Sequence, residues 1–144
     1  MYRIEKRFTV PIGHRLSKNK GRCFSIHGHN FTILVGLKSE KLNKDDMIID
    51  FSDLKSIVGS LLDQYDHTLL VNKIDEQWLK PLADKMCLRS MIFDNEDHDP
   101  TAERLSQQLF FKLDKIFSDM KIKFKLEYVT VYENENSKAV YSRE

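Results

Sequence analysis

The sequence predicts an α+β fold, with a four-stranded antiparallel sheet and two helices packed on one face of it. Two observations predict this class. Segments with period-two alternation lie in pairs toward the two ends of the chain, and two segments of helical periodicity lie between the pairs. With both helices on one face, the other face of the sheet is available to another subunit.

The four strands are indicated by apolar residues at alternate positions and by β-prone composition. The alternating apolar residues of the first pair are Tyr2, Ile4, Phe8 and Val10, then Phe31, Ile33, Val35 and Leu37. The second pair consists of the β-prone run 125–133 and a returning segment at 138–142, joined by a turn at 134–137.

Both helices are predicted from apolar stripes at helical spacing. The first is expected from Ser52, as its cap, and its stripe is Leu54, Ile57, Val58, Leu61, Leu62 and Tyr65. The second is expected to begin near Pro100 and Thr101, with the stripe Ala102, Leu105, Leu109, Leu113, Ile116, Phe117 and Met120. Residues 73–98 show no pattern that assigns them a structure.

Size and charge limit the function classes. The 144 residues suit one domain spanning residues 1–144, and 23 Lys and Arg balance 22 Asp and Glu, which does not favour a nucleic-acid binder. No stretch approaches the roughly 18 apolar residues of a membrane span, so a cytoplasmic protein is expected. Cys23 and Cys87 are expected to be free thiols.

Three histidines form a candidate metal site. His27 and His29 flank one residue at the start of a predicted strand, so both imidazoles point to the same side. His14, at the end of the preceding strand, reaches the same place if the two strands pair. Three imidazole nitrogens with a fourth position open to water are a catalytic zinc arrangement, although single histidines are more often satisfied by backbone hydrogen bonds.

Three further positions are candidates for the same chemistry. Cys23, four residues before His27, is either a fourth ligand that closes a structural zinc site or a thiolate base or nucleophile beside an open metal. Asp66 and His67 form a possible proton-carrying pair, or a helix C-terminal feature. Glu133, at the end of a strand, is either an acceptor for a guanidine-like ring edge or a solvated acid.

Taken in order, these segments resemble the 6-pyruvoyl-tetrahydropterin synthase and 6-carboxytetrahydropterin synthase superfamily across nearly the whole chain. The matching pieces are Phe8, His14-Arg15-Leu16, Cys23-Phe24-Ser25-Ile26-His27-Gly28-His29-Asn30-Phe31, Met47-Ile48-Ile49-Asp50-Phe51-Ser52-Asp53-Leu54-Lys55, Asp66-His67-Thr68-Leu69-Leu70, Pro100-Thr101-Ala102-Glu103 and Val131-Tyr132-Glu133. The Cys-x-x-x-His-x-His spacing is similar to the carboxy-forming branch. The chain departs from the family pattern at Asp99 and Arg104, where asparagines are common.

The resemblance implies a zinc-dependent lyase. It would convert 7,8-dihydroneopterin triphosphate to 6-carboxy-5,6,7,8-tetrahydropterin, acetaldehyde and triphosphate, an early step toward queuosine and related 7-deazaguanines. The residues implied are His14, His27 and His29 for Zn²⁺, Cys23 as general base, Asp66 and His67 as proton relay and Glu133 as pterin anchor.

The same resemblance implies the tunnelling fold, in which subunits join their sheets into a barrel, in a homohexamer built from two trimers. Two alternatives stay open for the function. One is 6-pyruvoyl-tetrahydropterin synthase activity, which expels only triphosphate. The other is a non-catalytic oligomer in which zinc is structural and Cys23 is one of its ligands.

Overall fold

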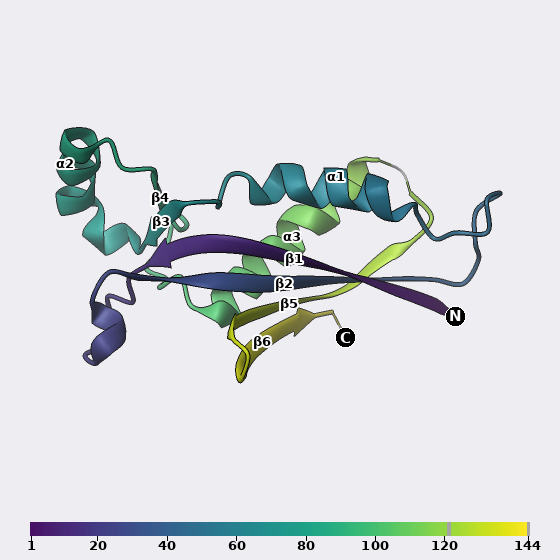
Figure 1. The fold of residues 1–144 in the computed structure, drawn as a ribbon, viewed down its shortest axis with the longest axis horizontal. Helices are drawn as coiled ribbons and strands as arrows, with labels where there is room; N and C mark the ends of the chain where they lie inside the picture. The colour runs from purple at the N-terminus through teal and green to yellow at the C-terminus, as the bar shows by residue number, and fades with distance from the viewer. Residues whose placement is uncertain (121, 144) are drawn as a thin grey trace.

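One mixed sheet is the framework of the fold. The computed structural model describes residues 1–120 and 122–143, and within them the sheet has six strands in the order β4-β3-β1-β2-β5-β6 (Figure 1). The strands are β1 (Tyr2–His14), β2 (His27–Ser39), β3 (Thr68–Val71), β4 (Ser90–Ile92), β5 (Lys125–Asn134) and β6 (Ser137–Ser142). The helices of the described residues are α1 (Phe51–Leu62), α2 (Glu76–Met86) and α3 (Ala102–Asp119), with 3-10 turns η1 (Arg22–Phe24) and η2 (Lys73–Asp75). The predicted α+β class is confirmed.

The two predicted strand pairs are joined in the centre of the sheet. β1 and β2 form an antiparallel ladder that runs from the Tyr2–Ser39 pair to the His14–His27 pair. β2 also pairs antiparallel with β5, and β5 with β6. The ladder of β1 and β2 matters for function because it brings the end of one strand to the beginning of the next.

The prediction of a four-stranded, wholly antiparallel sheet is wrong. β3 adds to β1 and β4 adds to β3, both in parallel, so the sheet has six strands and mixed direction. β3 has four residues and β4 has three. Runs this short do not display an alternation that distinguishes a strand from a loop.

A third helix, α2, was not predicted. It lies in the segment 73–98 and carries Pro81 in its interior, where the missing N–H removes a helical hydrogen bond. Leu79 is its one buried residue, and a proline inside the segment argues against a helix when the sequence is read alone. Figure 1 shows α2 beyond β3 and β4, away from α1 and α3.

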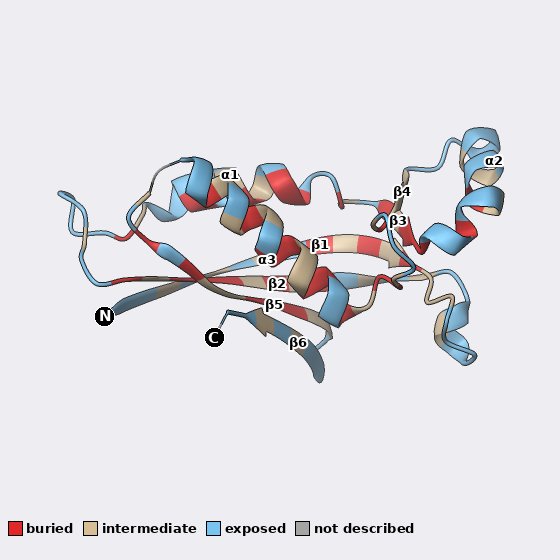
Figure 2. Cartoon of the chain, turned by 180° about the vertical axis from the view of Figure 1, so that it is seen from behind, coloured by how far each residue is buried: buried red, intermediate tan, exposed pale blue. Residues whose placement is uncertain are grey.

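α1 and α3 cover one face of the sheet and enclose the core, as expected. Buried residues of both helices turn toward the strands (Figure 2). The strand residues of this core are Val10, Ile12, Phe31, Ile33, Val35, Leu37, Leu70, Leu126, Val129 and Val131. Burying these alternate side chains fixes the register, because a slip of one residue would turn them all to the other face.

Both helices begin at a side-chain cap. The predicted cap Ser52 is wrong by two positions, because the carboxylate of Asp50 accepts the Ser52 N–H at 2.7 Å and makes Asp50 the N-cap of α1. Thr101 caps α3 by accepting the N–H of Arg104 at 3.2 Å. Pro100 therefore lies one residue before that cap.

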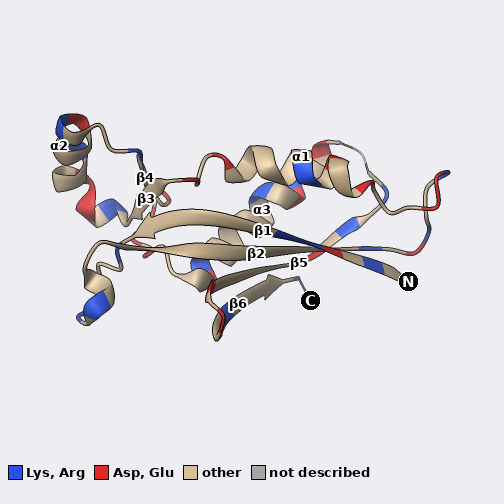
Figure 3. Cartoon of the chain, viewed as in Figure 1, with Lys and Arg blue, Asp and Glu red and all other residues tan. Residues whose placement is uncertain are grey.

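The opposite face of the sheet is polar. On it, Arg3 donates to Glu127 at 2.9 Å and the Tyr128 hydroxyl donates to Glu5 at 2.5 Å. Figure 3 shows basic and acidic residues dispersed along the chain rather than gathered in a single-sign stripe. Among the described residues, no helix is both long and apolar enough to span a membrane.

Candidate active site

The three predicted histidines meet at one end of the sheet. Pairing of β1 with β2 places His14 opposite His27, and His29 lies two residues along β2 on the same side. Their ligand atoms all lie within 4.8 Å of one another. His14 is almost fully buried, with 1% of its surface exposed, while His27 and His29 are half-buried. Sequence periodicity therefore located this cluster correctly.

Backbone carbonyls orient two of the rings. His14 Nδ1 lies 2.8 Å from the carbonyl oxygen of Pro100, and His27 Nδ1 lies 2.7 Å from that of Ser25. A carbonyl can only accept, so each Nδ1 carries the hydrogen and, in a neutral ring, each Nε2 presents a lone pair. These two Nε2 atoms face each other at 2.9 Å.

Burial keeps the His14 ring neutral. It lowers the pKa of His14 from 6.5 to about 4, against an opposing effect of the Pro100 carbonyl, and the neighbouring His27 and His29 lower it further. Two lone pairs facing each other at such a short distance repel, and a metal ion bound by both would remove this repulsion. The arrangement therefore suits a metal ion better than a direct hydrogen bond between the two rings.

The donor set fits a metal ion. Nitrogen ligands at zinc distances on a tetrahedral centre lie roughly 3.3 Å apart, close to the spacing seen here. Carbonyl groups that hold the outer ring nitrogen are the usual second layer of a histidine metal site. Among the described residues, the group that could hold a metal comprises these three histidines and no sulfur atom. The group could bind a metal ion.

Glu133 lies next to the triad. Its Oε1 is 4.0 Å from His14 Nε2, and its side chain is 28% exposed, so the carboxylate borders the cluster while remaining open on one side. It stands where the pairing of β5 with β6 shifts by one residue. Such an irregularity re-aims a side chain at the end of a strand.

Cys23 lies in the turn η1, between His14 and His27 in the chain. Its carbonyl oxygen accepts the N–H of Leu16 at 2.9 Å, which draws the turn against the residues that follow His14. The thiol is free and half-buried. Its sulfur atom is not part of the group of described residues that could hold a metal.

Asp66 and His67 are paired with each other but are not brought to the triad. His67 Nδ1 lies 2.6 Å from Asp66 Oδ1, and the imidazole is 77% exposed. In the parallel pairing of β1 with β3, His14 stands opposite Leu70, three residues or about 10 Å along the strand from His67. His67 adopts a φ of 53°, a left-handed conformation that a residue other than glycine seldom takes.

Some contributors to the site escaped the sequence analysis. The carbonyl of Pro100 orients His14 from 86 residues away. Asp99, noted above only as a departure from the family pattern, is buried and accepts the N–H groups of Ser17 and Lys18 at 3.0 and 2.8 Å. The sequence does not indicate which backbone carbonyl, such as that of Pro100, will accept a hydrogen bond. The carboxylate of Asp99, directly before Pro100, could have been recognised as a candidate acceptor.

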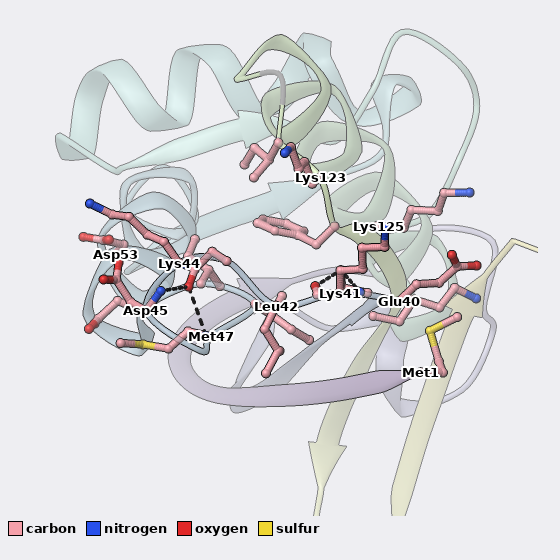
Figure 4. A pocket seen from close by; sticks show the side chains of 18 of the residues that line it. Met1, Glu40, Lys41, Leu42, Lys44, Asp45, Met47, Asp53, Lys123 and Lys125 are labelled. Carbon is pink, nitrogen blue, oxygen red and sulfur yellow. Dashed lines mark hydrogen bonds between the residues drawn. The ribbon is translucent and has the colours of Figure 1, made fainter.

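A large hollow in the described part of the chain lies elsewhere. It has a volume of about 1080 Å³ and is bordered by residues 38–50 and 122–125 (Figure 4). That region begins where β2 ends, roughly 40 Å along the strand from His27. Its described lining contains lysines and carboxylates but neither histidine nor cysteine. Residue chemistry, not cavity size, therefore identifies the candidate site.

Relatives of known name support the assignment. The 6-carboxy-5,6,7,8-tetrahydropterin synthase of Aquifex aeolicus is 26% identical to this chain over an alignment of 162 positions, gaps included, which covers 99% of each protein. The enzyme of the same name from Haemophilus influenzae is 32% identical over 117 residues, which are 78% of this chain and 82% of the relative.

Solved structures show the same fold. An uncharacterized protein from Wolinella succinogenes superposes with a TM-score of 0.77 at 22% identity, over 99% of this chain and 98% of the other. The 6-pyruvoyl tetrahydropterin synthase of Caenorhabditis elegans gives 0.71 at 22% identity, over 99% and 96%. The family model described as 6-pyruvoyl tetrahydropterin synthase matches residues 3–144. The chain therefore belongs to the 6-pyruvoyl tetrahydropterin synthase family and is a lyase.

Proposed function

We propose that this protein converts 7,8-dihydroneopterin triphosphate to 6-carboxy-5,6,7,8-tetrahydropterin, acetaldehyde and triphosphate, with bound Zn²⁺, on the route to queuosine and related 7-deazaguanines. Relatives that carry the name of the carboxy-forming enzyme over most or all of their length support this product. The Cys-x-x-x-His-x-His spacing from Cys23 to His29 supports it as well.

The observation that carries the proposal is the opposition of His14 and His27. Their Nε2 atoms face each other at 2.9 Å while both Nδ1 atoms are held by carbonyl oxygens. With His29 they offer three imidazole nitrogens to one ion, which would suit Zn²⁺ with one position left for substrate or water. When bound, zinc would supply Lewis acidity to the oxygens of the substrate side chain.

In this proposal, two side chains of the protein remove the substrate proton and bind the pterin ring. Cys23, in the turn between β1 and β2, removes a proton from the side-chain carbon of the substrate. Glu133 accepts two hydrogen bonds from the amino and ring N–H groups of the pterin, each contributing about 1.5–3 kcal/mol. Because Glu133 Oε1 lies 4.0 Å from His14, the anchored ring would place its side chain over the metal.

Asp66 and His67 complete the proton relay in this proposal, at the site of another subunit. Asp66 holds the imidazole of His67 by Nδ1 and leaves its Nε2 toward solvent, far from the triad of the same chain. A pair so oriented and exposed is suited to meet a second copy. We accordingly propose a homohexamer built from two trimers, with active sites at subunit interfaces.

The test is product identification. The zinc-loaded protein is incubated with 7,8-dihydroneopterin triphosphate, and the pterin product and acetaldehyde are identified by mass spectrometry. Carboxytetrahydropterin together with acetaldehyde supports the proposal. A pyruvoyl product would transfer the assignment to the sister activity, and unchanged substrate would contradict both.

Two variants separate a catalytic from a structural role of Cys23. Cys23→Ala should keep zinc and lose turnover, whereas His27→Ala should lose both, because His27 provides a ligand nitrogen. Zinc content is measured by elemental analysis, and X-ray absorption reports whether sulfur binds the metal. Release of zinc from Cys23→Ala, or sulfur in the coordination shell, would establish the structural alternative instead.

A further inference from the structure

Arg15 connects the turn that carries Cys23 to a segment far away in the sequence. Its Nε donates to the carbonyl oxygen of Phe24 at 2.8 Å, and its Nη1 donates to Asp75 Oδ1 at 2.9 Å. The guanidinium carbon lies 3.9 Å from the ring centre of Phe24 and 5.2 Å from that of Trp78. One planar group thus contacts the neighbour of Cys23 on one side and the start of α2 on the other.

The carboxylate of Asp75 accepts hydrogen bonds from the residues of this connection. It is 7% exposed and accepts from Arg15, from the hydroxyl of Ser17 and from Trp78 Nε1, the last at 2.8 Å. Asp75 occupies the N-cap position of α2, where aspartate ordinarily accepts a helix N–H, yet it makes no such bond. The side chain is therefore diverted from capping its own helix to holding the chain that follows His14.

The contacts restrain the Cys23 turn from both sides. Leu16 N–H donates to the Cys23 carbonyl at 2.9 Å, while Arg15 holds the Phe24 carbonyl. Ser25, at the end of the same turn, supplies the carbonyl that orients His27. A displacement of the turn would move the thiol relative to the histidines.

We propose that Arg15 and Asp75 are positioning residues for Cys23, fixing the place of its thiol relative to the histidine triad without touching the substrate. The inference rests on the proposed function, in which Cys23 is the base. Placement is decisive for such a group, since a misplacement of about 1 Å can lower a rate on the order of 100-fold.

The bridge requires an arginine. The planar, rigid guanidinium group donates hydrogen bonds in two directions, to a carbonyl and to a carboxylate. The single ammonium group of lysine cannot reach both acceptors, because they lie on opposite sides. Arg15→Lys keeps the positive charge beside the buried Asp75 and so preserves the fold while removing the bridge. Asp75→Asn tests the other end, and Asp84→Asn, exposed on the same helix, is its matched control.

The experiment measures kcat, KM, zinc content, thermal unfolding and the rate at which iodoacetamide alkylates Cys23. All variants carry Cys87→Ser, because Cys87 is exposed and would also react. For Arg15→Lys and Asp75→Asn we expect kcat to fall about 10- to 100-fold. KM and zinc content should stay as in the parent, and alkylation should become several times faster as the turn loosens.

Alkylation also separates this inference from the proposed function, because it is measured on resting protein. If the parent forms no carboxytetrahydropterin, the alkylation rates alone decide whether Arg15 and Asp75 position Cys23. Unchanged alkylation in both variants overturns the inference, and so does a parallel loss of zinc and of thermal stability, which would indicate general structural damage. Asp84→Asn should match the parent in every measurement.

Discussion

Acid should destabilise the metal-free protein through His14. Burial holds the pKa of this histidine at about 4 in the folded chain, against 6.5 when it is exposed. Between these values the unfolded chain binds a proton that the folded chain does not, so stability is complete above pH 6.5 and is lost as the pH falls toward 4. At about 1.4 kcal/mol for each pH unit, the loss between pH 7 and pH 4 is about 3 kcal/mol.

The assay is urea unfolding in the presence of a chelator, at several pH values across that window. The control is His14→Asn, which does not titrate but whose amide can still donate to the Pro100 carbonyl that His14 Nδ1 now contacts. Other groups change stability equally in both proteins, so the difference between the two curves isolates His14. Equal acid sensitivity of parent and variant would refute the reasoning.

Three further predictions concern packing, substrate and assembly. Gly36→Ala should lower the free energy of unfolding by about 1–3 kcal/mol, because its methyl group would lie 2.4 Å from the facing tyrosine ring. Gly59→Ala, in open space within α1, should raise the free energy of unfolding by about 1 kcal/mol. Urea unfolding measures both changes. Glu133→Gln should raise KM with little loss of zinc, as steady-state kinetics and metal analysis would show, and an unchanged KM would remove it from the pterin site. His27→Ala and His67→Ala should each be inactive alone and regain part of the activity when refolded together; no recovery would contradict a site shared between subunits.

The histidine cluster could be predicted because its geometry is local. His27 and His29 share a side by strand periodicity alone, and His14 joins them through a hairpin-like pairing whose two strands both alternate clearly. The core helices were equally visible, since α1 and α3 carry long apolar stripes. Where one period continues over many residues, the sequence determines which side chains meet.

What could not be predicted depends on contacts between distant segments. β3 and β4 are short strands added in parallel at one edge, and α2 has a proline inside it and buries only Leu79. The bridge from Arg15 to Asp75 spans 60 residues and joins two ordinary charged side chains. Pairs of this kind are brought together only by the folded chain, so no periodic pattern in the sequence predicts them.

The metal site and the loops around it should act as one unit. The carbonyls of Pro100 and Ser25 hold His14 and His27 so that their Nε2 lone pairs oppose each other, a geometry that is favourable when a cation binds them. Ser25 follows the Cys23 turn, and Pro100 follows Asp99, whose carboxylate fixes the chain after Arg15. Metal binding would therefore stabilise both loops, and an ion that binds only the folded state adds about 2.7 kcal/mol at a concentration 100 times its Kd. Because the same loops place the thiol, the site should be correctly assembled for catalysis only when it holds its metal.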